Sequence, residues 1–157
     1  MSVRRRSGLA VVDEREALSG YLGAQRESVV AIVTGLSPAD LARSVVPSGW
    51  TPASMLDHLA GMEWYWFGHV LGGAVDPPMR LPDAVAAYVA QWVVSDGVLA
   101  GLSLDAPPRA DVPPHQAELA RSARTVVLHV IEETARHAGH LDIARELLDG
   151  ATGLGPR

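Results

Sequence analysis

The sequence contains no cysteine and no lysine. Without cysteine the chain has no disulfide, no cysteine-ligated zinc site and no cysteine nucleophile. Without lysine it has neither a Schiff-base lysine nor the lysine of a phosphate-binding loop. Arginine therefore carries the positive charge, and the formal net charge of −5 at pH 7 argues against a dedicated nucleic-acid-binding protein.

Long hydrophobic runs are absent too. No stretch approaches the roughly 20 apolar residues that cross a bilayer, so we expect no membrane partner. The apolar stretch after Arg4–Arg6 is shorter than the core of a secretory signal, so we expect a disordered basic arm at 1–12 and a cytoplasmic protein. The 157 residues fit one globular domain, which we place at 13–151, with a C-terminal tail at 152–157.

Apolar residues recur at helical spacing in four long segments, and no segment has the alternating pattern of a strand. These segments cover approximately residues 13–34, 51–71, 83–102 and 116–148. Ser37 followed by Pro38 signals the start of a short helix between the first two segments. The sequence therefore predicts an all-α fold: an antiparallel four-helix bundle with an additional short helix between the first and second long helices.

Two of the predicted helices carry polar residues where a simple core would have leucine. Glu133 and His137 lie in the middle of the apolar face of the last helix, one turn apart and close enough to chelate one ion. His58 lies on the apolar face of the second helix. Buried groups of this kind are costly unless they are paired or bound to an ion. A ligand from a facing helix would complete a three-residue site with an open position, as in catalytic zinc centres.

The same residues allow other interpretations. His137 with His140 is an alternative ligand pair, although Glu133 lies more centrally on the helix face. His140 and His129 are alternatively neighbours that orient the ligands without binding the ion. An inward-facing histidine can also be an ordinary hydrogen-bonded residue of the core, and for His58 alone that interpretation is preferred.

Aromatic residues concentrate between positions 50 and 67, beside His58. Four side chains are expected to line a pocket for a small organic substrate, with core packing as the alternative: Met62, Tyr65, Trp66 and Trp92. Three apolar residues point away from the core on the helical wheel: Trp64, Leu128 and Ile131. Because outward apolar side chains are often covered by another subunit, we expect a homodimer.

Two motifs resemble those of a known superfamily. The stretch PSGWTPASMLDHLAGMEWYWF at 47–67 resembles the second-helix signature of the DinB-like superfamily, and LHVIEETARHAGHLD at 128–142 resembles its last helix. The chain is most similar to the actinobacterial branch of uncharacterised DinB-like proteins, which is related to mycothiol-dependent isomerases and S-transferases. The resemblance extends over nearly the whole chain.

The resemblance implies a bundle that holds a divalent metal through one residue of the second helix and two residues of the last. Carried over by position, these ligands are His58, Glu133 and His137. Many relatives have histidine where Glu133 stands, whereas the mycothiol-dependent isomerases also use glutamate. Relatives use zinc, nickel or iron, and zinc is the metal that we expect here. His140 stands in place of a family glutamine.

The function implied is a metal-dependent enzyme that activates a small thiol or water. Thiol S-transfer or thiol-assisted isomerisation with a mycothiol-like co-substrate follows from the resemblance, and no catalytic residue is assigned beyond the metal ligands. Arg80 and Arg136 are candidate contacts for an acidic thiol or substrate. Two alternatives stay open: a non-catalytic bundle that binds a small molecule, and a metal-independent cyclase or isomerase of specialised metabolism.

Overall fold

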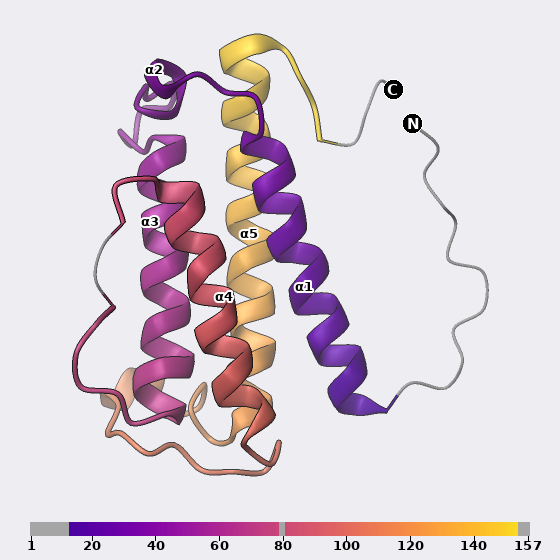
Figure 1. The fold of residues 1–157 in the computed structure, drawn as a ribbon, viewed down its shortest axis with the longest axis vertical. Coiled ribbons are helices and arrows are strands. Elements are labelled where there is room, and N and C mark those ends of the chain that lie inside the picture. The colour runs from indigo at the N-terminus through magenta and orange to yellow at the C-terminus, as the bar shows by residue number, and fades with distance from the viewer. Residues whose placement is uncertain (1–12, 79–80, 154–157) are drawn as a thin grey trace.

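The computed structural model describes residues 13–78 and 81–153, and all regular structure within them is helical. Four long helical segments stand side by side (Figure 1): α1 (Glu14–Val33), α3 (Pro52–Glu63) with its continuation η1 (Trp64–Leu71), α4 (Ala84–Ala100) and α5 (Ala123–Asp149). The short α2 (Pro38–Leu41) and the 3₁₀ turn η2 (Pro114–Gln116) lie in the connections. The predicted all-α bundle is confirmed, and α2 is the additional short helix.

Some of the predicted features fall on residues that the structure does not describe. The basic arm at 1–12 lies outside the described residues, as do Arg80 and the end of the tail from residue 154. None of the helices within the described ranges is long and apolar enough to cross a membrane.

The long helices run in the order up, down, down, up (Figure 1). Helices α1 and α5 start at the same end of the bundle and pack against each other, while α3 and α4 run in the opposite direction as a second packed pair. Residues 72–78 and 81–83 therefore lie along the length of the bundle between the end of η1 and the start of α4. Antiparallel contacts form between the two pairs, for example where α3 meets α5.

Side-chain caps set most of the helix boundaries. The Asp13 carboxylate accepts a hydrogen bond from the Glu16 backbone N–H at 2.8 Å, which starts α1. Thr51 and Ser54 form a reciprocal capping box at the start of α3, with distances of 2.9 and 3.0 Å. Gly150, with φ of 79°, ends α5 in the left-handed conformation that glycine adopts without strain.

The last helix begins later than the sequence predicts, at Ala123 and not near residue 116. Ser122 caps it, and the first N–H groups of the helix are occupied by the preceding loop. Ala123 N–H donates to the Ala106 carbonyl at 2.9 Å, and Arg124 N–H donates to the Leu104 carbonyl at 2.8 Å. These loop contacts connect residues far apart in sequence, so local periodicity does not reveal them.

The second long helix changes geometry at Trp64. Its residues up to Leu71 form a π-helix, which has hydrogen bonds from i to i+5 and a wider turn than an α-helix. Gly72 ends this segment by donating to the Phe67 carbonyl at 2.9 Å, and a Cβ at Gly72 would lie 2.5 Å from the Gly68 carbonyl oxygen. The expected single α-helix over 51–71 is therefore wrong beyond Glu63, and the helical wheel misplaces the side chains that follow.

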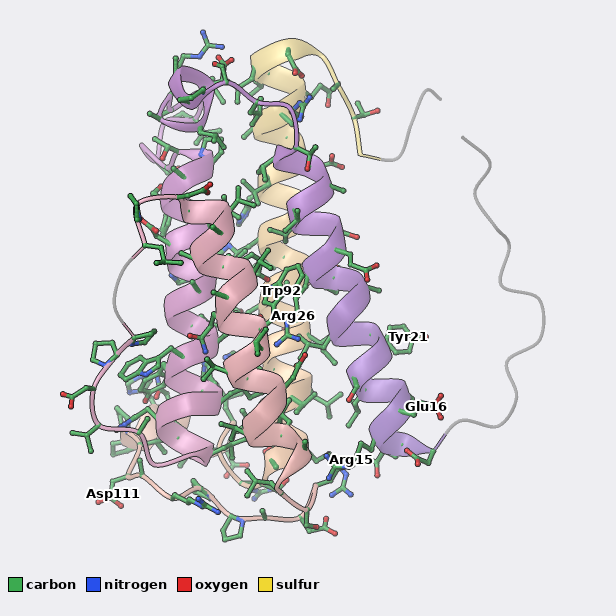
Figure 2. The ribbon with its side chains drawn as sticks, in the orientation of Figure 1. Arg15, Glu16, Tyr21, Arg26, Trp92 and Asp111 are labelled. Carbon is green, nitrogen blue, oxygen red and sulfur yellow. The ribbon has the colours of Figure 1, made fainter. Side chains whose placement is uncertain are left out.

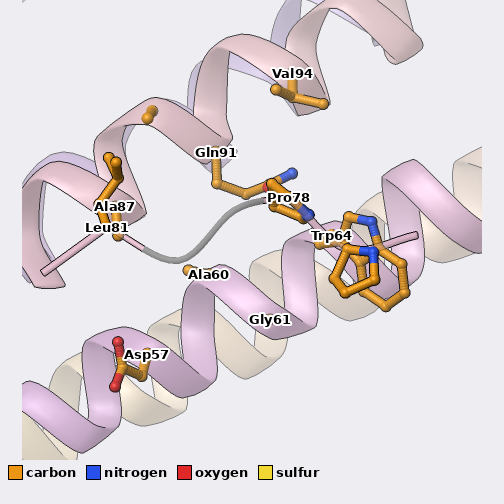
Figure 3. Close-up of a pocket in the computed structure, with 11 residues that line it drawn as sticks. Asp57, Ala60, Gly61, Trp64, Pro78, Leu81, Ala87, Gln91 and Val94 are labelled. Carbon is orange, nitrogen blue, oxygen red and sulfur yellow. The ribbon is translucent and has the colours of Figure 1, made fainter. Parts of the chain in front are cut away.

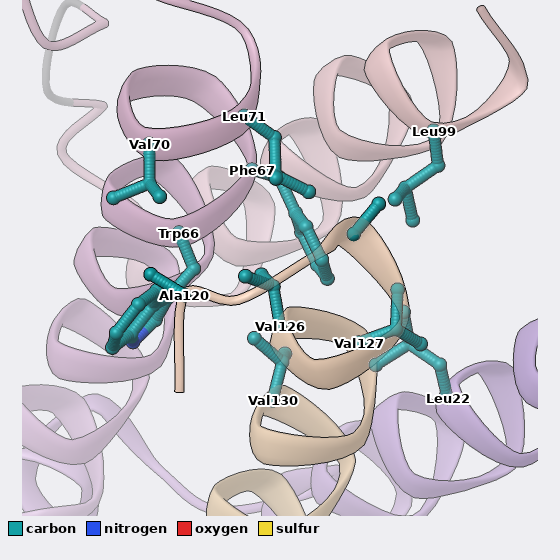
Figure 4. Packing of buried hydrophobic residues seen from close by; sticks show 11 residues of the cluster. Leu22, Trp66, Phe67, Val70, Leu71, Leu99, Ala120, Val126, Val127 and Val130 are labelled. Carbon is teal, nitrogen blue, oxygen red and sulfur yellow. The ribbon is translucent and has the colours of Figure 1, made fainter. Parts of the chain in front are cut away.

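Two clusters of buried apolar side chains form the core, one towards each end of the bundle. The cluster in Figure 4 is built around Trp66 and Phe67 of η1, Val126 and Val130 of α5, and Leu22 of α1. The other joins residues of α1, α3 and α5 around Tyr88 of α4. All four long helical segments contribute to this core, which orients the inward faces of α3 and α5 towards each other.

A buried ion pair lies between the two clusters. Arg26 of α1 donates to both carboxylate oxygens of Glu63, from Nε at 2.8 Å and from Nη2 at 2.6 Å. Its Nη1 donates to Asp96 of α4 at 2.8 Å. Arg26 is 3% exposed and Glu63 0%. Figure 2 shows Arg26 in the middle of the bundle near Trp92, whose ring centroid lies 5.7 Å from the guanidinium carbon.

Candidate metal centre

Two histidines from facing helices approach each other between α3 and α5. His58 of α3 and His137 of α5 approach through their Nε2 atoms, which lie 3.2 Å apart. The rings are nearly perpendicular, at 82°. His137 is buried, whereas His58 is exposed to solvent. Burial lowers the pKa of His137, and the neighbouring His58 lowers it further, which favours the neutral ring that has a free lone pair for a metal.

Glu133 lies next to this pair. Its Oε2 is 3.5 Å from His137 Nε2, one helical turn away on α5. Its Oε1 accepts a hydrogen bond from Arg136 Nη1 at 3.1 Å, and the carboxylate side chain is 20% exposed. The structure thus brings His137 close to both His58 and Glu133, on the same ring nitrogen.

The spacing of these atoms suits a tetrahedral ion. Two ligands that each lie about 2.0–2.1 Å from one zinc ion are about 3.3–3.4 Å apart. The two observed distances of 3.2 and 3.5 Å are close to that value. In residues 13–78 and 81–153, however, no three metal-binding side chains form a group that could hold an ion as they stand. Glu133 would have to turn towards His58 to complete such a group.

His140 approaches the other side of the His137 ring. The two Nδ1 atoms are 3.3 Å apart, whereas His137 Nε2 faces His58 and Glu133. A partner at Nδ1 fixes the tautomer and orientation of a histidine that binds through Nε2. The structure therefore places His140 beside Nδ1 of His137, and not beside the nitrogen that faces His58.

His129 is separated from this centre. His129 and His137 are eight positions apart, about 12 Å along an α-helix. The His129 ring packs edge-on against Trp66, with ring centroids 4.9 Å apart. Trp66 belongs to the apolar core, so the structure places His129 beside a core aromatic side chain and not beside His137.

The four predicted pocket residues pack inside the bundle instead. Trp66 is 4% exposed and belongs to a core cluster, and Met62 packs against both clusters. The Tyr65 hydroxyl donates to Gln116 Oε1 at 2.5 Å. Trp92 packs edge-on against Tyr88 at 5.3 Å. None of the four lines either cavity described below.

A cavity of about 330 Å³ adjoins the histidines. One wall comes from the segment before α3 and its first turns, and the other from the C-terminal half of α5, where His137 and His140 lie. Trp50 borders it and contacts the His58 ring edge-on, with centroids 5.5 Å apart. Trp50 belongs to the aromatic group between positions 50 and 67, but periodicity cannot show how the loop around it folds back onto α5.

A second cavity, of about 290 Å³, lies between α3 and α4 (Figure 3). Trp64 lines it together with Pro77 and Pro78 of the returning segment, and Gln91 reaches it from α4. Trp64 was expected to be a free outward residue, and this cavity explains its partial burial. The lining includes none of His58, Glu133 and His137.

Comparison with known proteins gives one family. The family model described as Mycothiol-S-transferase matches residues 17–150. No curated protein and no solved structure matches the chain. The matched range contains α3, η1, α4 and all of α5, and with them the histidine pair and Glu133. Because the match extends over most of the chain and of its bundle, the chain belongs to the mycothiol S-transferase family of DinB-like proteins.

Proposed function

We propose that the chain is a metal-dependent S-transferase that uses mycothiol or a similar small thiol. The observation that supports this most directly is the approach of two imidazole Nε2 atoms within 3.2 Å, with the Glu133 carboxylate 3.5 Å from one of them. His58, Glu133 and His137 would hold the ion, most simply zinc, whose preferred ligands are nitrogen and oxygen atoms of this kind. A thiol bound to zinc is a thiolate at neutral pH.

Two neighbouring residues orient these ligands. His140 orients His137 from Nδ1, and Arg136 fixes one oxygen of Glu133 so that the other remains free. Because the chain has no cysteine, the sulfur must arrive with the co-substrate. In the transfer, the thiol proton is released to solvent and the sulfur forms a bond to an electron-poor carbon of the acceptor. The leaving group of that carbon departs with the bonding electron pair.

A second function is favoured by a different observation. The cavity beside the histidines is lined mainly by apolar side chains, which suits a bundle that binds a hydrophobic molecule without catalysis. Metal analysis separates the two functions. Protein purified without chelators should carry about one zinc ion per chain if the centre is built as proposed. A content well below half an equivalent would favour the binding protein.

Replacing Glu133 by glutamine tests the carboxylate ligand. We expect zinc affinity to fall by about 10–100-fold or more, because the neutral amide removes one charged ligand. Competition with a chelating dye measures the affinity. Glu132→Gln is the matched control, since it makes the same change at the adjacent exposed position and should leave zinc binding unchanged. If the zinc affinity of Glu133→Gln were unchanged, Glu133 would not be a ligand, and His140 would be assigned as the third ligand.

We also propose a homodimer, although the exposed apolar residues that support it differ in part from those expected from the sequence. Trp64 lines a cavity and Ile131 packs against a core cluster, so only Leu128, which is 50% exposed, remains outward as expected. Val89, Val93 and Val94 add an exposed apolar strip along α4. Apolar surface of this kind is often covered by a partner. Sedimentation at micromolar concentration should give twice the chain mass, and a single-chain mass would remove the proposal.

A further inference from the structure

The cavity beside the histidines offers no charged partner to a ligand. Its apolar walls come from Val46, Trp50 and Met55 on one side and from Leu141, Ile143 and Ala144 of α5 on the other. Among the residues that the structure describes, no aspartate, glutamate or arginine lines it, and the chain has no lysine. The ionisable groups in this described lining are the imidazoles of His137 and His140. A charged group that entered this space would lose its hydration without an opposite charge to replace it.

Apart from the exposed hydroxyl of Ser48, the polar side chains in the lining are largely engaged. Thr51 Oγ1 accepts a hydrogen bond from Ser54 N–H at 3.0 Å as part of the helix cap. His140 and His137 face each other through Nδ1. A polyhydroxylated molecule such as a sugar thiol would therefore leave several hydroxyl groups without partners, and each unpaired buried hydroxyl is costly. The cavity suits an uncharged apolar group better than the body of such a thiol.

The position of the cavity connects it with the candidate metal centre. His137 is both a lining residue and the residue whose Nε2 faces His58. Trp50, at the border, contacts His58 itself. The cavity therefore touches His137 directly, and only the Trp50 ring connects it with His58.

The same pair also has a polar, solvent-facing surface. His58 is exposed, and Glu133 forms an ion pair with Arg136, whose side chain is 62% exposed. Neither Glu133 nor Arg136 lines the cavity. A hydrophilic co-substrate can reach the pair from this surface and keep most of its hydration.

We infer that the cavity bordered by Trp50, Ile143 and Ala144 is the binding site for an uncharged, apolar acceptor, while the hydrophilic thiol reaches His58 from solvent. This inference rests on the proposed transferase function, because it divides the two substrates of that reaction between two surfaces. It makes the cavity walls, and not the metal ligands, the residues that determine which acceptor is used.

Binding of a matched pair of probes to the full chain tests the assignment. The probes are 2-naphthylmethanol, which is neutral, and 2-naphthoate, which has a similar size but carries a negative charge. The measurement is titration calorimetry on protein stripped of metal, without thiol, so that no ion attracts the carboxylate. The neutral probe should bind at least about tenfold more tightly, because the walls offer the charge no partner. Equal binding of the two probes would overturn the inference.

Two leucine substitutions locate the probe. Ala144→Leu fills the cavity beside the histidines and should weaken binding of the neutral probe by about tenfold or more, because the ring can no longer leave water. Ala90→Leu is the matched control, since it makes the same change in the second cavity and should leave binding unchanged. Unchanged binding in Ala144→Leu, or loss in Ala90→Leu, would contradict the assignment.

Two further measurements keep the outcomes distinct. If circular dichroism shows that Ala144→Leu does not fold, Ile143→Asn replaces it, because position 143 is 56% exposed and tolerates a polar residue. That variant should also weaken the neutral probe, and unchanged binding would count against the cavity. Zinc content of the unstripped protein is measured in parallel. Probe binding in a protein that never carries metal would reject the transferase, whereas zinc without probe binding would reject only the acceptor site.

Discussion

Replacing Glu63 by alanine should lower the free energy of unfolding by about 3–5 kcal/mol, the cost of leaving one charge of a buried pair uncompensated. Arg26, which is 3% exposed, would lose two hydrogen bonds and its buried counter-charge. Burial works to lower the pKa of Arg26, but its bonds to Glu63 and Asp96 outweigh this and raise the pKa. Arginine does not deprotonate in proteins, so the charge persists without its partner.

Removing the other partner of the pair, in Arg26→Ala, should lower the free energy of unfolding by less. Burial raises the pKa of Glu63, with the bonds from Arg26 opposing the shift. In Arg26→Ala the carboxyl group can therefore take up a proton and become neutral, which Arg26 cannot do in Glu63→Ala. The double variant Arg26→Met, Glu63→Leu should recover most of the stability, because apolar residues of similar size replace buried pairs at little cost.

Urea denaturation followed by circular dichroism measures these differences. Asp96→Ala is the control, since the side chain of Asp96 is 61% exposed and solvent-facing ion pairs contribute about 0–1 kcal/mol. If Glu63→Ala were as stable as Asp96→Ala, the pair would not have the energetic importance that its burial implies.

Replacing His137 by alanine should remove the bound metal, with affinity falling by more than about 100-fold. Loss of a residue that only supports a ligand costs about 10–100-fold, and loss of the ligand itself costs more. His137 is also the residue that lies close to both of the other donors, so without it no shared neighbour connects His58 with Glu133. Helical content should remain, because the two apolar clusters do not include His137.

Elemental analysis of the purified variant gives the answer directly. His129→Ala is the matched control, because it removes a histidine from the same helix that packs on Trp66 and should keep its metal. Metal content that stays unchanged in His137→Ala would show that the ion, if bound, is held elsewhere.

Most of the bundle could be predicted because its signals are local. Thr51–Pro52 predicts a helix start and Gly150 predicts a helix end. In the structure α3 begins at Pro52 and α5 ends at Asp149. The start of α5 was misplaced because it depends on loop carbonyls of Leu104 and Ala106. Helix directions depend equally on packing between distant segments.

The candidate site was predicted in part for a related reason. His58, Glu133 and His137 stand out as polar residues on apolar helix faces, and the structure brings them close to one another in pairs. Arg26 carried the same signal, four residues after Leu22 and three before Val29, but its partner Glu63 lies on another helix. The cavity could not be predicted, because half of its wall is a loop without periodicity.

The wide turn between Trp64 and Leu71 also decides which side chains of this segment reach the core. An α-helix rotates by about 100° for each residue, and the wider π-helical turn rotates by less. Rewinding the same residues as an α-helix would therefore add rotation that accumulates along the segment. Phe67, Val70 and Leu71, all 0% exposed, would then shift away from their present neighbours in the interior.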